Sequence, residues 1–259
     1  MHNIARNKAA IIGASGAIGC AFSRELIQQG FTHIDTFTRS EFCLQDYSSR
    51  LAGVISHNYT PITLNNYTLN ITDEESIRQA VTKAHAIDAA PYDLIFVASG
   101  ILHRKNIRPE KSLKSVSLTQ LESVFSINTF GPILLAKHFL PKLQQSSPSV
   151  FAVLGARVGS ISDNRLGGWY SYRASKAALH MLIKTVSIEW QRNNSNAIII
   201  SLHPGTVDSP LSFPFQARIP KHQLFPAEKS AAHLFNVIQH LKPADTGKIL
   251  AWDGSEITP

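Results

Sequence analysis

The sequence predicts a single α/β domain in which a doubly wound parallel sheet of about seven strands is covered by helices on both faces. Short apolar runs alternate with longer amphipathic stretches along the whole chain, which is the pattern of strand–helix–strand units. No repeat or linker divides the 259 residues, and 44% of them are hydrophobic, enough for one large core. We therefore treat residues 1–259 as one domain.

The elements follow from this alternation in order. The short apolar runs predict strands at 9–12, 34–38, 62–69, 94–98, 150–154, 197–202 and 249–252. Apolar residues at helical spacing predict helices at 17–29, 73–85, 118–144, 172–192 and 227–241. Ligands of such sheets bind beyond the carboxyl ends of the strands, so the candidate chemistry is sought there.

Charge and composition exclude several classes of protein. The chain has 25 Lys and Arg against 18 Asp and Glu, a net charge of +7, which is compatible with nucleic acid, an anionic membrane or a polyanionic small ligand. The basic residues are scattered, however, and the densest stretch, 103–108, is typical of a solvated loop. No apolar run approaches the ~18 residues of a membrane span. Cys20 and Cys43 cannot build a disulfide framework. We expect a cytoplasmic protein with no nucleic-acid partner, no membrane contact and no metal.

Three glycines follow the first strand and open the first helix. Gly13, Gly16 and Gly19 are evenly spaced, and glycine permits both a tight turn and a close approach of backbone N–H groups to a pyrophosphate. The spacing differs from the usual dinucleotide fingerprint. The turn predicts a phosphate cradle, and the alternative is that these glycines serve only the strand–helix turn.

The end of the second strand indicates which nicotinamide cofactor would bind. An acidic residue there would take the ribose hydroxyls of NAD, whereas an arginine accommodates the extra phosphate of NADP. Here Arg39 and Ser40 follow the strand, and the first acidic residue is Glu41. Arginine offers a planar fork of donors to a phosphate. The sequence favours NADP(H) over NAD(H), and the alternative is a solvated surface arginine.

Tyr172 and Lys176 are four residues apart and lie on one face of a predicted helix. A nearby ammonium group favours the phenolate and lowers the pKa of a tyrosine. Such a tyrosine can give or take a proton near neutral pH. The same pair can also be an ordinary surface pair, so its meaning depends on its surroundings.

Asn128 lies on the apolar face of its predicted helix, together with Leu121, Val124 and Phe125. A polar side chain there needs hydrogen-bond partners. Pro132 has no N–H group to pair with the Asn128 carbonyl, so the helix should kink there. The free carbonyl could hold a water molecule. The alternative is a kink with a structural asparagine.

Together these motifs resemble the short-chain dehydrogenase/reductase family over essentially the full chain. The glycine turn, Asn128, Tyr172 with Lys176, and the turn of His203, Pro204 and Gly205 occur in the order typical of that family. The segments 158–168, 211–225 and 252–257 further resemble its C-factor-type and sniffer-type carbonyl reductases. The resemblance implies a Rossmann-type fold and hydride transfer between NADP(H) and a carbonyl or alcohol.

The resemblance also implies a role for each residue. The tyrosine protonates the carbonyl oxygen, the lysine lowers the tyrosine pKa and binds the nicotinamide ribose, and the asparagine holds a water molecule. The predicted catalytic residues are Tyr172, Lys176, Asn128 and Ser160. The predicted cofactor residues are Gly13, Ser15, Gly16, Ile18, Gly19, Arg39, Ser40, Asn70, Ile71, Ser99, Gly100, Lys176, Pro204, Gly205, Val207 and Ser209.

The sequence departs from the family pattern at three places. In the glycine turn, Ala17 replaces a glycine and Gly16 comes one place early. After the fourth strand, only Gly100 remains of the usual Asn-Asn-Ala-Gly, preceded here by Ser99. Most important, the position of the catalytic serine is Ala156. Losing one such donor typically lowers turnover ~10²–10³-fold. Ser160, one turn along, is the candidate to replace it.

The segment 211–225 contains three phenylalanines and should cover the nicotinamide, which suggests an apolar carbonyl substrate. The alternative is simply a packed loop. By analogy with the family, the long helices that contain Asn128 and Tyr172 suggest a homodimer or homotetramer. Two functional hypotheses remain. One is an NADPH-dependent carbonyl reductase, and the other, motivated by Ala156, is an NADP(H)-binding sensor or signalling protein with little catalysis.

Overall fold

The protein is built on a seven-stranded sheet, and its computed structural model describes residues 4–39 and 61–259. All neighbouring strands are parallel, in the order β3-β2-β1-β4-β5-β6-β9. The strands are β1 (Lys8–Ile12), β2 (His33–Thr38), β3 (Thr63–Thr68), β4 (Leu94–Val97), β5 (Ser149–Leu154), β6 (Ala197–His203) and β9 (Ile249–Ala251). Each corresponds to a predicted strand, and the predicted fold class is confirmed.

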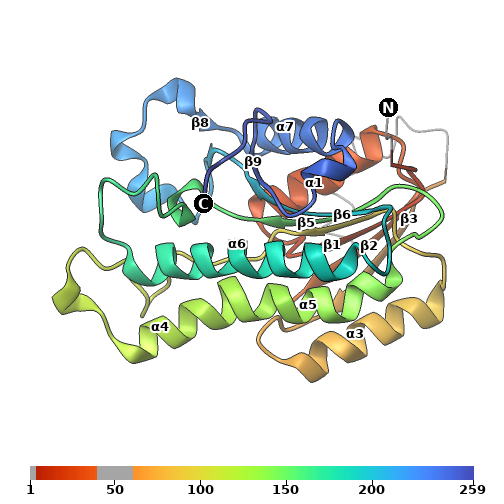
Figure 1. The fold of residues 1–259 in the computed structure, drawn as a ribbon, viewed down its shortest axis with the longest axis horizontal. Helices are drawn as coiled ribbons and strands as arrows, with labels where there is room; N and C mark the ends of the chain where they lie inside the picture. Colours follow the sequence, from red (N-terminus) through yellow and green to blue (C-terminus); the bar gives the residue numbers. More distant parts are fainter. Residues whose placement is uncertain (1–3, 40–60) are drawn as a thin grey trace.

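Helices cover the sheet on both sides (Figure 1). The helices α1 (Ala17–Gln28) and α7 (Ala227–Gln239) pack together on one face. The opposite face is covered by α3 (Glu74–Ile87), α4 (Leu118–Phe125), α5 (Gly131–Phe139) and α6 (Tyr170–Trp190). Each face has its own buried apolar cluster, so the sheet is the middle layer of three. On the α1 side, Phe22 stacks on Phe96 with ring centroids 3.9 Å apart. No helix in the described ranges is long and apolar enough to cross a membrane.

The predicted helix 118–144 is not continuous. It begins as α4, passes through a π-helical turn at Ser126–Phe130, and continues as α5. The turn precedes Pro132, which lacks the N–H group that a regular helix would pair with the Asn128 carbonyl. At the place where the sequence predicts a kink, the structure has a π turn, a recognised cause of helix bending.

The fold creates a crevice between β1 and β4, where the strand order reverses. Strands on one side of this point run β3-β2-β1 and those on the other side run β4-β5-β6-β9. The carboxyl ends of both central strands open into the crevice. A two-stranded ribbon of β7 (Thr206–Val207) and β8 (Leu224–Phe225) was not predicted. It joins the two ends of the segment 208–223, which extends from this end of the sheet (Figure 1).

Candidate active site

Two adjoining cavities occupy the carboxyl end of the sheet. The larger, of about 620 Å³, contains Tyr172 in its wall and is called here the tyrosine cavity. The smaller, of about 450 Å³, contains Gly13 and Gly16 and is called the glycine cavity. Both cavities are lined by the residues that follow β4, namely Ala98, Ser99 and Gly100. They form one continuous region across the point where the strand order reverses.

Two glycines of the turn are packed so closely that a side chain would not fit. Gly13 has a φ of 86°, and a Cβ there would lie 2.7 Å from the Ser99 hydroxyl oxygen. A Cβ at Gly19 would lie 2.3 Å from the Gly13 carbonyl oxygen. Gly16 is the N-cap of α1 and has no side chain to cap the helix, so the first N–H groups of α1 are left for another partner. This arrangement fits a pyrophosphate at the helix N-terminus.

Much of the remaining wall of the glycine cavity comes from the ends of β2 and β3, and Arg104 and Ile127 contribute to it as well. Arg39 follows β2, and Asn70 and Ile71 follow β3. No acidic side chain is among the described residues that line this cavity. The predicted residue Ser40 lies outside the described residues. The other predicted cofactor residues that line this cavity are Gly13, Ser15, Gly16, Ser99 and Gly100.

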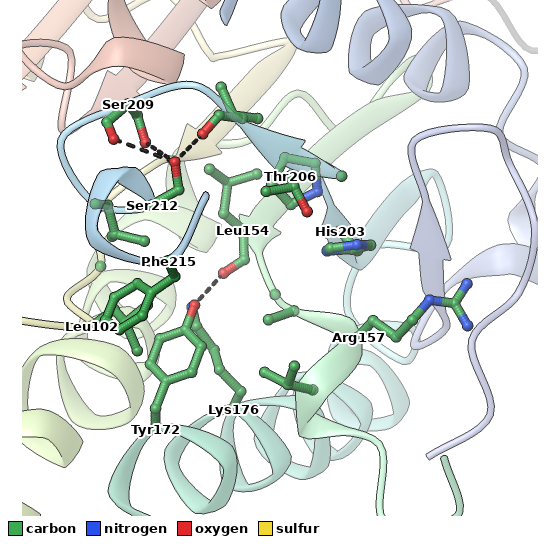
Figure 2. Close-up of a pocket in the computed structure, with 18 of the residues that line it drawn as sticks. Leu102, Leu154, Arg157, Tyr172, Lys176, His203, Thr206, Ser209, Ser212 and Phe215 are labelled. Atoms are coloured by element: carbon green, nitrogen blue, oxygen red, sulfur yellow. Dashed lines mark hydrogen bonds between the residues drawn. The ribbon is translucent and has the colours of Figure 1, made fainter. Parts of the chain in front are cut away.

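Tyr172 and Lys176 lie one turn apart near the start of α6 (Figure 2). Lys176 is buried, with 3% of its surface exposed, and its ammonium group donates a hydrogen bond of 2.7 Å to the Leu154 carbonyl oxygen. Burial lowers the pKa of Lys176 to about 8, and burial raises the pKa of Tyr172 to about 12. The expected lowering of the tyrosine pKa is therefore wrong for this structure. Lys176 faces the Leu154 carbonyl, with its nitrogen 6.0 Å from the centre of the tyrosine ring, so desolvation decides the direction.

Asn128 is fully buried and has three hydrogen bonds. Its side-chain oxygen accepts from the Ile101 N–H at 2.8 Å, and its side-chain nitrogen donates to the Ile101 carbonyl at 2.8 Å and to the Ser175 hydroxyl at 3.2 Å. A Cβ at Gly100 would lie 3.5 Å from the Asn128 side-chain oxygen and 3.8 Å from the Lys176 nitrogen. Asn128 thus joins the loop after β4 to α6, next to the lysine.

Ala156 lines the tyrosine cavity, whereas Ser160 does not. The Ser160 hydroxyl donates to the Thr258 carbonyl at 2.5 Å and accepts from the Asp163 N–H at 3.1 Å. Its side chain is therefore held by its own loop and by the tail after β9. The prediction that Ser160 replaces the missing serine is not supported by this geometry, because its hydroxyl is already engaged away from Tyr172.

Four further predicted residues line the tyrosine cavity on the far side of Tyr172: Pro204, Gly205, Val207 and Ser209. Ile18 lines it as well, from the start of α1. Phe215, from the segment predicted to cover the site, also lines the cavity. Phe213, in contrast, is 71% exposed and turned to solvent.

Comparison with known proteins identifies the family of this chain. The sequence model described as "short chain dehydrogenase" matches residues 7–218. The chain belongs to the short-chain dehydrogenase family. Among curated relatives, the C-signal of Myxococcus xanthus is 30% identical over 146 residues, which cover 56% of this chain and 82% of that protein. The 1-hydroxy-2-glutathionyl-2-methyl-3-butene dehydrogenase of Rhodococcus sp. (strain AD45) is 26% identical over 245 residues, 95% of this chain and 96% of that protein.

Solved structures of the family share the fold. An NADPH-bound carbonyl reductase from chicken fatty liver superposes with a TM-score of 0.82 at 23% identity and covers 97% of this chain and 98% of its own. The carbonyl reductase Sniffer of D. melanogaster superposes with a TM-score of 0.79 at 19% identity and covers 98% and 99%. These likenesses show that the chain has the same fold as both reductases.

The sequence predicts Trp169 at the mouth of this short-chain dehydrogenase site but gives no sign of Glu110. Trp169 has a left-handed backbone, with φ 53°, directly after two left-handed glycines. Its ring lies 6.1 Å from that of Tyr172 and 5.0 Å from that of Phe215. The turn is held by the buried Glu110, whose carbonyl accepts from the Trp169 N–H at 2.6 Å and whose carboxylate accepts from Ser171. The pair of glycines before Trp169 was the available signal, whereas nothing local indicates Glu110.

Two polar residues of the cavity wall were also missed as site residues. His203 and Thr206 flank the turn of Pro204 and Gly205, and both line the tyrosine cavity (Figure 2). The available signal was their position, because they immediately surround a turn already assigned to the cofactor.

Proposed function

We propose that this protein is an NADP(H)-dependent carbonyl reductase in which Tyr172 is the proton donor. The main support is that Tyr172 and Lys176 line the cavity that adjoins the glycine turn, while the buried Asn128 bonds Ser175, next to the lysine. One end of this region has the backbone of a phosphate cradle, and the other has an acid–base residue in a largely apolar pocket. That combination suits a dinucleotide and a small carbonyl substrate.

The described residues fit the cofactor. The glycine turn would hold the pyrophosphate, and Arg39 with the nearby wall of the glycine cavity would hold the adenosine phosphate that distinguishes NADP(H). Lys176 and the turn of Pro204 and Gly205 would hold the nicotinamide side. Bound NADPH supplies a hydride. Three structural neighbours are described as NADP(H) complexes, which supports the same cofactor here.

The protonation states favour the direction of reduction. With a pKa of about 12, Tyr172 holds its proton at neutral pH and can give it to a carbonyl oxygen that gains negative charge. With a pKa of about 8, Lys176 is mostly cationic at pH 7 and stabilises the tyrosinate that remains. Asn128 keeps α6 and the loop after β4 in register, so both groups stay at the same wall of the cavity.

The cavity favours an apolar substrate, because its wall is mostly apolar and includes Leu102, Leu154, Trp169 and Phe215. A homodimer or homotetramer in the cytoplasm is part of the proposal. Exposed apolar side chains support it: Phe130 at the π turn, and Met181 and Ile188 on α6. Light scattering after gel filtration at micromolar concentration should show a multiple of the 28.5 kDa chain mass. A monomer would contradict this part of the proposal.

A second candidate function is an NADP(H)-binding sensor or signalling protein with little catalysis. It is favoured by Ala156, since the cavity has no serine where the family places one, and Ser160 is engaged elsewhere. The similarity to the C-signal of Myxococcus xanthus is compatible with this role.

One experiment separates the two candidates. NADPH and NADH are titrated into the purified protein while nicotinamide fluorescence is followed, and a panel of aromatic and aliphatic carbonyls is then added. A reductase binds NADPH more tightly than NADH and oxidises it when a carbonyl is present. Tight binding without turnover on any carbonyl supports the sensor.

Replacing the proton donor tests the mechanism directly. Tyr172→Phe removes the donor but preserves the ring that packs on Trp169, so we expect turnover to fall ~10²–10⁴-fold. NADPH affinity should change little. Tyr170→Phe, on the same helix at a half-exposed position outside the cavity, is the matched control and should retain activity. If Tyr172→Phe reduces carbonyls as fast as the parent, the assigned role is wrong.

A further inference from the structure

The wall of the tyrosine cavity opposite Tyr172 contains a polar group for which the proposed mechanism has no use. His203 is the last residue of β6, and its ring lines the cavity (Figure 2). Strands β5 and β6 pair so that Leu154 is opposite Leu202. His203 therefore follows at the level of Gly155, next to the backbone of Ala156. It is a histidine beside the very position where the serine is missing.

Only a glycine fits at position 155, because the side chains of Ser201 and His180 pack against it. A Cβ at Gly155 would lie 2.2 Å from the Ser201 hydroxyl oxygen and 2.7 Å from Nε2 of His180 on α6. Ser201 and His203 are two residues apart on β6, so their side chains point to the same face of the sheet. The side chains of His180 and Ser201 thus lie against a glycine of the cavity wall, and His203 follows on the same face of β6.

These side chains have polar atoms without partners in the described part of the chain. Both ring nitrogens of His180, the Ser201 hydroxyl and Nδ1 of His203 are buried and form no hydrogen bond there. Buried polar groups are rarely left unpaired, and a group of them calls for an explanation. In His203, Nδ1 is buried without a partner, Nε2 is not among the buried unpaired atoms, and the residue lines the cavity.

The pKa of His203 determines how many N–H groups its ring can donate. Burial lowers the pKa of His203 to about 4, and the cations of Arg157 and Lys176 act in the same direction, against Asp253. The ring is therefore neutral at pH 7 and has one N–H group. An N–H group on Nδ1 would be buried without an acceptor. We therefore assign the proton to Nε2.

We propose that His203 donates a hydrogen bond from Nε2 to the carbonyl oxygen of the substrate, in place of the serine absent at position 156. The proposal rests on the function proposed above. In the reaction, the hydride from NADPH adds to the carbonyl carbon, and the oxygen takes the proton of Tyr172. His203 transfers nothing. Its N–H group stabilises the negative charge that develops on the oxygen, and such a donor is typically worth ~10²–10³-fold in turnover.

The kinetic test uses the holoenzyme with the best carbonyl of the panel. His203→Ala should lower kcat ~10²–10³-fold with little change in KM, because the bond strengthens as charge develops. Adding Ala156→Ser to His203→Ala should restore at least a tenth of the lost rate, because the hydroxyl returns to the family's position. A purely structural role of His203 would not be rescued in this way. His240→Ala, at the exposed end of α7, is the control for histidine removal and should leave kcat unchanged.

A second measurement needs no turnover. Nitrogen NMR of the histidine rings in the parent, with His203→Ala to assign the signal, should show His203 neutral at pH 7 with the proton on Nε2. A proton on Nδ1 would overturn the inference, since the donor would then point away from the cavity.

The outcomes distinguish the inference from the function on which it rests. A parent that turns over no carbonyl overturns the reductase function and this inference with it. An active parent with an equally active His203→Ala overturns the inference alone. Thr206 lines the same cavity on the other side of the Pro-Gly turn and offers a hydroxyl donor of its own. If Thr206→Val lowers kcat and His203→Ala does not, the role belongs to Thr206.

Discussion

At the scale of single residues, the site depends on burial more than on pairs of charges. Lys176 and Tyr172 are one turn apart, yet burial moves the lysine pKa down and the tyrosine pKa up. Both shifts favour the neutral side chain, as desolvation requires. The same rule applies to His180, whose pKa falls to about 3 through burial, with the positive charge of Lys176 and the neighbouring His203 acting in the same direction.

The buried His180 should make the fold sensitive to acid. Between pH 6.5 and about 3 the unfolded chain binds a proton at this ring that the folded chain does not bind. The free energy of unfolding therefore falls as the pH falls through that window. At pH 5 the contribution is ~2 kcal/mol for one fully buried ring. His180→Met should make the loss of stability between pH 7 and pH 5 smaller by up to that amount, as measured by urea unfolding at both values.

The comparison of two pH values separates this effect from packing. Any cavity left by His180→Met lowers stability equally at pH 7 and pH 5 and leaves the difference unchanged. His240→Met removes a histidine from the exposed end of α7 and should preserve the acid sensitivity of the parent. An unchanged difference between the two pH values in His180→Met would show that this ring does not resist protonation.

At the scale of elements, the important device is the π turn between α4 and α5. It places Asn128 and Thr129, both buried, on the side that meets α6. The Thr129 hydroxyl donates to the Ser175 carbonyl at 2.8 Å, and Asn128 bonds Ser175 and both main-chain groups of Ile101. One turn of helix thus joins the loop after β4 to the segment of α6 that contains Tyr172 and Lys176.

Asn128→Ala should damage both stability and turnover. It leaves the Ile101 N–H and carbonyl buried without partners, and each such group costs ~1–3 kcal/mol. We expect urea unfolding to show a loss of at least about 2 kcal/mol. Asn236→Ala, at an exposed position of α7, is the matched control and should change stability by less than ~0.5 kcal/mol. A fully stable Asn128→Ala with normal turnover would show that the link between the β4 loop and α6 is dispensable.

The elements also show what the sequence can and cannot predict. All seven strands of the main sheet and the principal helices follow from apolar periodicity, because each pattern reports a local geometry. Periodicity did not predict the break at 126–130, since a π turn keeps the apolar face and changes only the hydrogen bonding. The ribbon of β7 and β8 has two residues per strand, too few for any period to be visible.

In the candidate site, too, features with a local sequence pattern could be predicted and features that depend on distant contacts could not. The residues next to glycine and Pro-Gly turns were predictable, because those turns lie at strand ends, where the fold places its ligands. The position of Ser160 was not, because its partner, Thr258, is far away in the sequence. The direction of the Tyr172 pKa shift depends on how deeply the whole molecule buries the ring. Glu110 holds Ser171 across a similar separation and has no local signature.

At the scale of the whole molecule, the two cavities join the two halves of the sheet. The glycine cavity lies over β1, β2 and β3, and the tyrosine cavity over β4, β5 and β6, with the residues after β4 shared. A ligand that spans both cavities binds only the folded chain, so it should stabilise the molecule as a unit. At a concentration of 100 times its Kd, such a ligand raises the free energy of unfolding by about 2.7 kcal/mol.

Arg39 should decide which dinucleotide produces this stabilisation. It is an exposed guanidinium in the wall of the glycine cavity, and one charge-assisted contact is worth about 1.5–3 kcal/mol, or ~10–100-fold in affinity. At the same NADPH concentration, Arg39→Ala should therefore retain only about 0.4–1.4 kcal/mol of stabilisation in urea unfolding. The smaller effect of NADH should not change, because NADH has no phosphate at that position. Arg165→Ala, an exposed arginine outside both cavities, controls for lost positive charge. Equal losses with NADPH and NADH would mean that Arg39 stabilises the cavity wall without reading the phosphate.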